Sequence, residues 1–299
     1  VDTDEGIWGV GEAGIVSPPQ ALLGALEHFK AILVGQDPFR IEHIWQTLFR
    51  GGFFPAQRIL TSAISAIDIA LWDIKGKALG VPVYELLGGR VRDRVVCYPH
   101  NVGHQLDTQA LVDSCLQTTA DGWKFARLGL PSDGKILEPR PMILTAIAQF
   151  QAVREALGDE IEIVFDVHTR LDLPDALWLC QELEPFRPYF VEDPLRSENP
   201  DSFKTLRPRT AVPLAAGEQF SSKWEFRQLI EEEWIDYARI DLCIAGGFTE
   251  SKKIVGWCET HYIKLVTHNP LGPVSSAACL QLNLATPNFG VQEEPRKPG

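Results

Sequence analysis

The chain has 299 residues, of which 45% are hydrophobic and 23% are charged, proportions that are ordinary for a globular protein. Its formal net charge of -12 argues against a nucleic-acid partner, and no apolar run is long enough to predict a membrane-spanning helix. Six cysteines are scattered without a Cys-x-x-Cys pair, so we expect reduced thiols. Since nothing at the N-terminus resembles a signal peptide, these features predict a cytoplasmic protein with no membrane partner.

Residues 1–90 predict a small α+β domain. A Gly-rich alternation over residues 6–12 favours a strand, and the run 63–73 is apolar nearly all round, which predicts a buried helix. Because the chain opens at Val1 inside strand-like sequence, we expect this domain to be truncated at its start. Helices are expected at 19–34, 41–49 and 61–79.

Residues 91–299 alternate between strand-like and helical patterns, which favours a parallel sheet. Strands are expected at 94–98, 124–129, 161–166, 188–192, 213–218, 237–241, 263–268 and 289–292. Helical patterns lie between them, for example at 107–120, 141–157, 173–184, 222–232 and 249–260. Eight such strands predict an α/β fold with a (β/α)₈-type barrel, in which chemistry gathers at the carboxyl ends of the strands.

Six of the apolar runs end in an ionisable residue, at a nearly constant spacing of about 25 residues. These residues are Asp166, Glu192, Glu218, Asp241, His268 and Glu293. Taken singly, an acid at a strand end is more often a helix cap or a loop contact. The shared phase of all six favours a functional site instead.

Asp166, Glu192 and Glu218 end three consecutive strands and are predicted to converge. Carboxylates that lie so near to one another repel unless a cation lies between them. Because oxygen ligands favour hard ions, the sequence predicts a Mg²⁺ site, with Mn²⁺ as the alternative.

Asp241 and His268 end adjacent strands. A carboxylate bonded to one imidazole nitrogen fixes the tautomer and raises the basicity of the other nitrogen. His168 stands two residues after Asp166, so on extended backbone the two would share one face. Two histidines facing one substrate can act as base and acid. His100, after the first strand, is a candidate for lining the pocket.

The chain resembles the enolase superfamily, in the mandelate racemase-like subgroup of acid-sugar dehydratases. Three segments resemble the metal-ligand motifs of this family: Asp166-Val167-His168, Val191-Glu192-Asp193-Pro194 and Ala216-Gly217-Glu218. Residues 1–90 resemble the N-terminal capping domain of the family, and 91–299 its barrel. The segment from His268 to Pro273 is similar to galactonate dehydratases, whereas the segment from Asn288 to Glu293 is closer to mannonate dehydratases.

The resemblance implies a mechanism and a small-molecule sugar acid as substrate. Mg²⁺ would bind the substrate carboxylate while His268, oriented by Asp241, removes the neighbouring proton to give an enediolate. His168 would protonate the departing 3-hydroxyl, which yields a 2-keto-3-deoxy acid. Glu293, in protonated form, would contact the substrate carboxylate. The resemblance also implies a homo-oligomer.

The second strand separates the branches of the resembled family. Racemases and glucarate dehydratases carry Lys-x-Lys there, and this chain has Arg127 and Gly129 at those positions. Arginine is a poor base because its pKa is too high, so Arg127 is expected to contact the metal site or the substrate. The alternatives to a galactonate-, mannonate- or gluconate-like dehydratase are a racemase or epimerase on the same scaffold, or a non-catalytic metal-binding regulator.

Overall fold

The computed structural model describes residues 1–15, 17–100, 107–132 and 138–295. By its internal contacts the chain divides into two compact units, described separately below. The first unit comprises Val1–Val95, Glu218–Arg227 and Ile240–Gln292, and the second comprises Val96–Gly217, Gln228–Arg239 and Glu293–Gly299. The predicted division into domains at residue 90 stays a prediction.

The strands form one eight-stranded sheet in the order β1-β8-β7-β6-β5-β4-β3-β2. The strands are β1 (Cys97–Pro99), β2 (Phe125–Gly129), β3 (Glu162–Asp166), β4 (Phe190–Glu192), β5 (Leu214–Ala216), β6 (Tyr237–Ile240), β7 (Lys264–Thr267) and β8 (Phe289–Glu294). The described pairs from β2 to β6, and the pair β7 with β8, are parallel. Since β1 also contacts β2, the (β/α)₈-type fold predicted from the alternation is confirmed.

The strands form where apolar runs lie between two helices. In β3 every residue after Glu162 is buried, and β2 is buried throughout. Parallel strands covered by helices read as continuous apolar runs, because both faces of the sheet are shielded from water. A charged residue inside such a strand therefore needs a buried partner.

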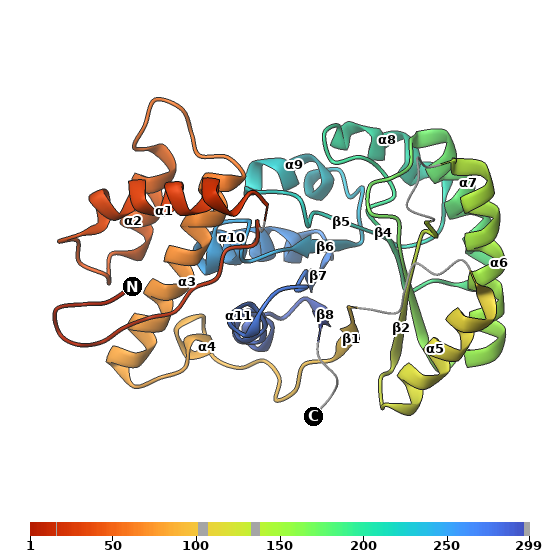
Figure 1. Ribbon diagram of the computed structural model, residues 1–299, viewed down its shortest axis with the longest axis horizontal. Coiled ribbons are helices and arrows are strands. Elements are labelled where there is room, and N and C mark those ends of the chain that lie inside the picture. Colours follow the sequence, from red (N-terminus) through yellow and green to blue (C-terminus); the bar gives the residue numbers. More distant parts are fainter. Residues whose placement is uncertain (16, 101–106, 133–137, 296–299) are drawn as a thin grey trace. The chain divides into compact units, whose positions relative to one another are not determined.

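Helices of the second unit follow its strands. They are α5 (Thr108–Ala120), α6 (Pro139–Leu157), α7 (Leu173–Leu183) and α8 (Phe203–Leu206), with 3₁₀ turns at Glu184–Phe186, Pro200–Ser202 and Arg207–Arg209. α5 packs against α6, and α6 against α7 (Figure 1). Asp107 caps α5 by accepting the Ala110 N–H at 3.0 Å, which satisfies one of the exposed donors of the first turn.

The first unit is built around one long helix. Its helices are α1 (Pro19–Leu33), α2 (Ile41–Arg50), α3 (Ile59–Leu79), α4 (Val83–Leu86), α10 (Gly247–Thr260) and α11 (Pro273–Ala285). The residues of α9 (Lys223–Glu231) up to Arg227 belong to the first unit, and the rest of this helix belongs to the second. α3 contacts α1, α2 and α10, and Figure 1 shows it running beside them. It is buried on most sides, as the apolar run 63–73 predicts. Trp45 and Phe49 stack in the same core, with ring centroids 4.8 Å apart.

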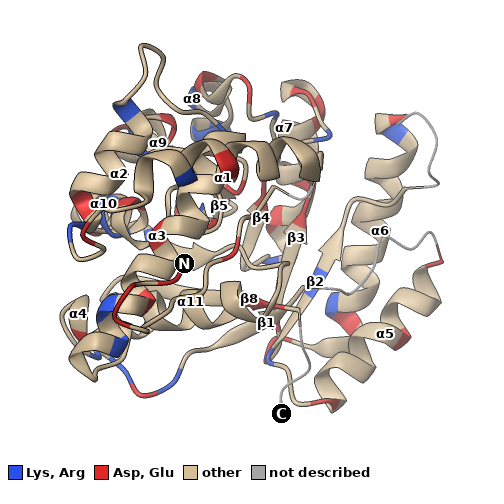
Figure 2. Ribbon diagram, turned by 60° about the vertical axis from the view of Figure 1, so that its left-hand side comes forward, with Lys and Arg blue, Asp and Glu red and all other residues tan. Residues whose placement is uncertain are grey.

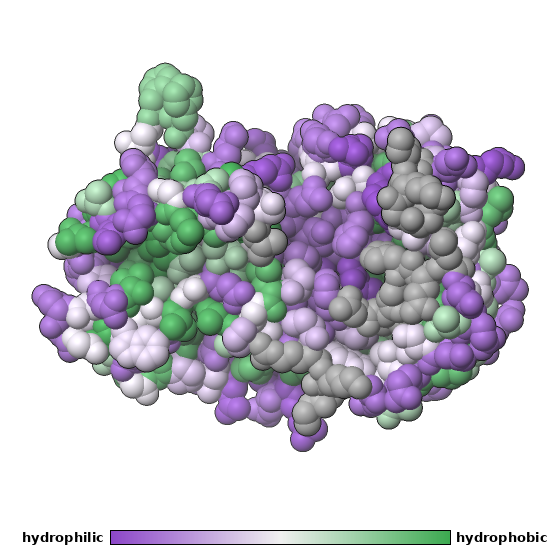
Figure 3. All heavy atoms as spheres, in the orientation of Figure 1, coloured by the Kyte–Doolittle hydropathy of each residue, from purple (hydrophilic) through white to green (hydrophobic). Residues whose placement is uncertain are grey.

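Several local predictions need correction. Residues 6–12 do not form a strand; the described pairing there is an isolated bridge between Asp2 and Trp8. The first strand lies at Cys97–Pro99 rather than 94–98, and the short helix α4 is not among the helices expected in residues 1–90. Gly51–Pro55 form a loop in which Phe53 is 94% exposed, and Figure 3 shows its hydrophobic tip projecting from the surface.

None of the six cysteines, all of which the structure describes, forms a disulfide, and five of them are buried. Burial raises the pKa of the thiols of Cys180 and Cys258 to about 12, so these side chains are protonated and unreactive at neutral pH. In the described part of the chain, no helix combines the length and the apolar composition that crossing a membrane requires.

Candidate active site

Two carboxylates lie at the carboxyl ends of neighbouring strands in the second unit. Asp166 is the last residue of β3, Glu192 is the last residue of β4, and the two are register partners. Figure 2 shows acidic positions on β3 and β4 and a basic position on β2. Both carboxylates are fully buried. Because burying an ionised carboxylate is costly without partners, the groups around them decide what this end of the sheet can hold.

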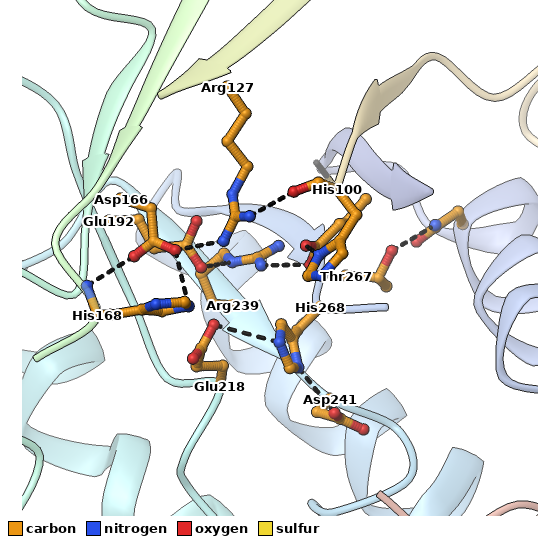
Figure 4. Close-up of polar contacts among 12 residues, drawn as sticks. His100, Arg127, Asp166, His168, Glu192, Glu218, Arg239, Asp241, Thr267 and His268 are labelled. Carbon is orange, nitrogen blue, oxygen red and sulfur yellow. Dashed lines mark hydrogen bonds and ion pairs between the residues drawn. The ribbon is translucent and has the colours of Figure 1, made fainter. Parts of the chain in front are cut away.

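Asp166 is held by a guanidinium and by a histidine (Figure 4). Arg127, reaching from β2, donates to Oδ2 of Asp166. The backbone N–H of His168 donates to Oδ1 at 2.8 Å, and Nε2 of His168 lies 3.0 Å from Oδ2. Burial alone would raise the pKa of Asp166, but the charge of Arg127 and the bonds from His168 lower it to about 2. Asp166 is therefore an ionised acceptor at neutral pH.

His168 reaches Asp166 through a turn and not along a strand. β3 ends at Asp166, and both His168 and Thr169 have φ of 55°, in the left-handed region. The expectation of extended backbone over 166–168 is therefore wrong, although the two side chains do meet. Non-glycine residues in this region cost roughly 1 kcal/mol or more each, and such strain concentrates at functional sites.

A second guanidinium bridges two more buried carboxylates. Arg239, on β6, is fully buried and donates from Nε to Glu192 at 2.5 Å. Its other end donates to Oε2 of Glu293 at 2.6 Å, while Oε1 of Glu293 lies 2.5 Å from Nδ1 of His100. The second unit thus buries three carboxylates against the two guanidiniums of Arg127 and Arg239. Carboxylates brought this close to one another favour a cation at this end of the sheet.

Arg239 is a residue that the sequence reasoning missed. It stands two residues before Asp241, and the period of a strand places alternate residues on one face, so the pattern contained a signal for it. Its contact also bears on Glu293. A carboxylate paired with a guanidinium is favoured in its ionised form, whereas the family resemblance implies a protonated Glu293. That protonated state stays a prediction, and the ion pair argues against it.

The first unit holds the histidine–carboxylate pair. Nδ1 of His268 lies 2.8 Å from Oδ2 of Asp241, as the adjacent strand ends predict (Figure 4). Oδ1 of the same carboxylate accepts the backbone N–H of Cys243 at 2.7 Å. Nε2 of His268 lies 3.3 Å from Oε2 of Glu218. This arrangement assigns the Nδ1 proton to the bond with Asp241, so Nε2 is the nitrogen that faces Glu218 and can accept a proton.

Glu218 lies beyond its predicted strand. β5 ends at Ala216, so Glu218 belongs to the turn that follows, and it is 9% exposed. β5 neighbours β4 in the sheet, and Glu192 is the register partner of Ala215. In sequence, Asp166 and Glu192 end β3 and β4, and Glu218 follows the end of β5 by two residues.

Oxygen donors of this kind fit Mg²⁺, because hard cations prefer carboxylate ligands. In the described residues no three acidic, histidine or cysteine side chains are already drawn together around one point. Arg127 and Arg239 instead pair with Asp166 and Glu192. The carboxylate oxygens of Asp166, Glu192 and Glu218 are nevertheless the donors that a divalent cation prefers, so the residues present fit the predicted metal.

The predicted site residues fall into two groups. In the second unit, the side chains form one network of contacts. Arg127 contacts Asp166 and His100, and Asp166 also contacts His168. His100 contacts Glu293, which Arg239 connects to Glu192. In the first unit, contacts connect Glu218, Asp241 and His268.

Together, the parallel eight-stranded fold and the acids and histidines at its strand ends define a (β/α)₈ enzyme equipped for acid–base chemistry beside a cation. Comparison with known proteins agrees. Residues 1–88 match the mandelate racemase / muconate lactonizing enzyme N-terminal domain, and residues 111–299 match the enolase C-terminal domain-like family. The chain belongs to the mandelate racemase / muconate lactonizing enzyme family of the enolase superfamily.

Several relatives carry one activity in their names. A D-galactonate dehydratase from Ralstonia nicotianae is 41% identical over 294 residues, covering 98% of this chain and 76% of the relative. One from Variovorax paradoxus is 42% identical, with the same coverage. Among solved structures, an enolase from Pantoea ananatis with bound D-gluconate and Mg superposes with a TM-score of 0.91 at 31% identity. That match covers 98% of this chain and 78% of the other.

Proposed function

We propose that the chain is a Mg²⁺-dependent dehydratase of a sugar acid, with D-galactonate as the first candidate and D-gluconate as the second. The D-galactonate dehydratases at about 40% identity support the reaction, and the Pantoea ananatis structure supports the cation and an aldonic acid. The enzyme is thus a hydro-lyase. It removes the proton next to the carboxylate and eliminates the 3-hydroxyl, which gives a 2-keto-3-deoxy acid and water.

Asp166, Glu192 and Glu218 are proposed to hold the cation. Their support is their place at the ends of consecutive strands, the register pairing of the first two, and the ionised state of Asp166. Bound there, Mg²⁺ supplies positive charge that stabilises the developing negative charge on the substrate carboxylate. Arg127 and Arg239 would keep Asp166 and Glu192 ionised and oriented for this ligation.

His268 is the proposed base. Asp241 holds Nδ1, so Nε2 takes the proton from the carbon next to the substrate carboxylate. His168 is the proposed acid, which gives its proton to the 3-hydroxyl as the carbon–oxygen bond breaks and water leaves. The contact of His168 Nε2 with the Asp166 carboxylate, at 3.0 Å, orients the imidazole for this step.

Substrate contacts are proposed for His100, Arg127 and Glu293. His100 is the most accessible of the three, with 25% of its side chain exposed, and its contact with Glu293 fixes the ring. Arg127 is 7% exposed and is engaged by Asp166, which favours an electrostatic contribution over a direct contact with the substrate. A cytoplasmic location and a homo-oligomeric assembly belong to the same proposal.

The observation that carries the proposal is the His268 geometry: Nδ1 is fixed by Asp241 while Nε2 faces the carboxylate of Glu218. A base oriented toward a metal-ligand carboxylate suits abstraction of a proton beside a substrate carboxylate. The test is a library of aldonic and aldaric acids incubated with Mg²⁺, with 2-keto-3-deoxy products trapped by semicarbazide. We expect one strong hit among galactonate, gluconate and mannonate, abolished by EDTA and restored by Mg²⁺.

The alternatives predict different results in the same assay. A racemase or epimerase would exchange the α-proton with deuterium and invert the carbon without releasing a keto acid. A regulator would bind the acid and Mg²⁺ but show neither exchange nor product. Either pattern, found with the cation demonstrably bound, would overturn the dehydratase proposal.

A further inference from the structure

Two loops of the first unit carry the proposed base and its partner. The loop after β6 begins with Asp241 and runs to the start of α10, and the loop after β7 begins with His268 and runs to the start of α11. Residues 12–15, which we call the N-terminal clamp, are hydrogen-bonded to both loops. In Figure 1 the segment that contains the clamp passes along α3 before it enters α1.

Glu12 is bonded to the His268 loop through both carboxylate oxygens. Oε1 accepts the backbone N–H of Gly272 at 2.7 Å, and Oε2 accepts the N–H of Ser275 at 2.9 Å. These donors belong to the first turn of α11, whose N-cap residue, Gly272, has no side chain to accept them. A carboxylate is the preferred partner at this end of a helix, because it satisfies the exposed donors and complements the helix dipole. Glu12 therefore caps α11 from 260 residues away in the chain.

Gly14 binds the Asp241 loop. Its backbone N–H donates to the carbonyl oxygen of Cys243 at 2.8 Å and lies 2.9 Å from Oγ of Ser62. Ser62, on α3, in turn donates to the same Cys243 oxygen at 2.9 Å and is fully buried. The N–H of Cys243 donates to the Asp241 carboxylate. Cys243 is therefore hydrogen-bonded both to the clamp, through Gly14, and to the carboxylate that holds His268.

The clamp and α3 together leave the two loops little freedom. Ser65, one turn after Ser62, accepts the N–H of Gly246 at 2.8 Å, and Asp68 accepts the N–H of Thr249 at 3.1 Å. On the other loop, Asn269 donates to Ser276 at 2.9 Å inside the protein. The Glu12 bonds thus complete a frame that fixes the chain on both sides of the His268–Asp241 contact.

We propose that Glu12 is a positioning residue for proton abstraction: by fixing Gly272 and Ser275, it sets the place of His268 against Asp241. This inference rests on the proposed function of His268 as the base. Glu12 acts through the backbone of the loop, where it accepts the N–H groups of Gly272 and Ser275. A displacement of a reacting group by about 1 Å lowers a rate on the order of 100-fold, so a distant clamp has a measurable effect on catalysis.

The first experiment replaces Glu12 and compares the variant with a matched cap. Glu12→Ala removes both acceptors, and Asp107→Ala removes the cap of α5, which lies in the other unit. Both should lower the melting temperature by a few degrees, because each loses a helix cap. Only Glu12→Ala should lower kcat, by about 10- to 100-fold with KM changed less than threefold. Its kinetic isotope effect with α-deuterated substrate should also rise, as proton abstraction becomes slower.

The second experiment disturbs the same contact from its other side. A Cβ at Gly272 would lie 2.6 Å from Oε1 of Glu12, so Gly272→Ala pushes the carboxylate away while Glu12 itself is retained. The backbone at Gly272 is extended and admits alanine without strain. If Glu12 acts through Gly272, the double variant Glu12→Ala/Gly272→Ala should have the kcat of Glu12→Ala alone, whereas independent effects would multiply.

A readout that needs no turnover separates this inference from the proposed function. The proton on Nδ1 of His268, bonded to Asp241, should give a low-field resonance that His268→Asn removes. Glu12→Ala should shift or broaden this resonance, and Asp107→Ala should leave it in place. An unshifted resonance together with unchanged kcat in Glu12→Ala would overturn the positioning role, even if the sugar acid is confirmed. A shifted resonance in a protein that dehydrates nothing would retain the positioning role and reject the dehydratase.

Discussion

Nδ1 of His268 lies 2.8 Å from Oδ2 of Asp241, although the two residues are 27 positions apart in the chain. The contact joins the end of β7 to the end of β6, and the His268 backbone N–H also donates to the Ile240 carbonyl at 3.1 Å. The pairing thus follows directly from the order of the strands. An imidazole fixed in this way presents only Nε2 to a substrate, which determines its tautomer before any substrate arrives.

Asp241→Asn tests whether the carboxylate sets that tautomer. An amide nitrogen placed against Nδ1 would donate to it, so the proton would move to Nε2 and the base would be blocked. We expect kcat to fall by about 10²- to 10⁴-fold, with Mg²⁺ affinity unchanged. Steady-state kinetics and calorimetric titration of the cation measure the two quantities. Full activity in Asp241→Asn would show that His268 needs no carboxylate partner.

Glu192→Gln tests the ligand assignment. The amide keeps the shape but removes the charge, so Arg239 loses one buried ionic partner and keeps Glu293. We expect Mg²⁺ affinity to fall by at least about tenfold. Glu162→Gln, on the exposed residue at the start of β3, is the matched control and should bind Mg²⁺ as the parent does. Equal affinities in the two variants would remove Glu192 from the proposed ligand set.

His168→Asn separates the two proton transfers. With the acid removed, the 3-hydroxyl can no longer leave as water, and keto-acid release should fall by about 10²-fold or more. His268 would remain able to exchange the α-proton, so slow deuterium incorporation into recovered substrate should persist in NMR spectra. If exchange is lost together with elimination, His168 is the base and the roles of the two histidines must be reversed.

The sequence predicted the strand ends well because each buried strand of a parallel sheet is an uninterrupted apolar run. Asp166, Glu192 and Asp241 could be placed on this basis alone. The turn that brings His168 back to Asp166 could not be predicted, since the period of a strand gives no sign that φ becomes positive after Val167. Nor could the pairing of Arg239 with Glu293, because it depends on which side chains share the interior of the sheet.

Longer-range contacts were still less accessible from the sequence. Glu12 caps a helix that lies 260 residues further along the chain, and its two partners are backbone groups with no side-chain pattern of their own. A carboxylate before the first helix has many other uses, so no local rule distinguishes this one. Only the folded chain shows that Glu12 and Gly272 are in contact.

Asp68 provides a prediction about stability. The side chain is fully buried on α3, where Oδ2 accepts the N–H of Thr249 at 3.1 Å and where the charge of Glu42 on α2 also acts on it. Desolvation by burial raises the pKa of Asp68 from 3.8 to about 7, although bonds from Thr249 and Phe248 oppose the rise. The folded protein therefore holds a proton that the unfolded chain releases near pH 4.

The sign of the pH dependence follows from that proton. Between about pH 4 and pH 7 the folded state binds more protons than the unfolded state, so the free energy of unfolding falls as the pH rises, and the loss is complete above about pH 7. A shift of about three pKa units corresponds to roughly 4 kcal/mol. Asp68→Asn removes the titration and keeps an acceptor for Thr249. The melting temperature of this variant relative to the parent should therefore rise steadily from pH 4 to pH 7.5 in calorimetry.

Glu27→Gln, on the exposed face of α1, is the control and should give a constant difference across that range. Parallel curves for the parent and Asp68→Asn would show that Asp68 is ionised throughout and that α10 tolerates a buried charge.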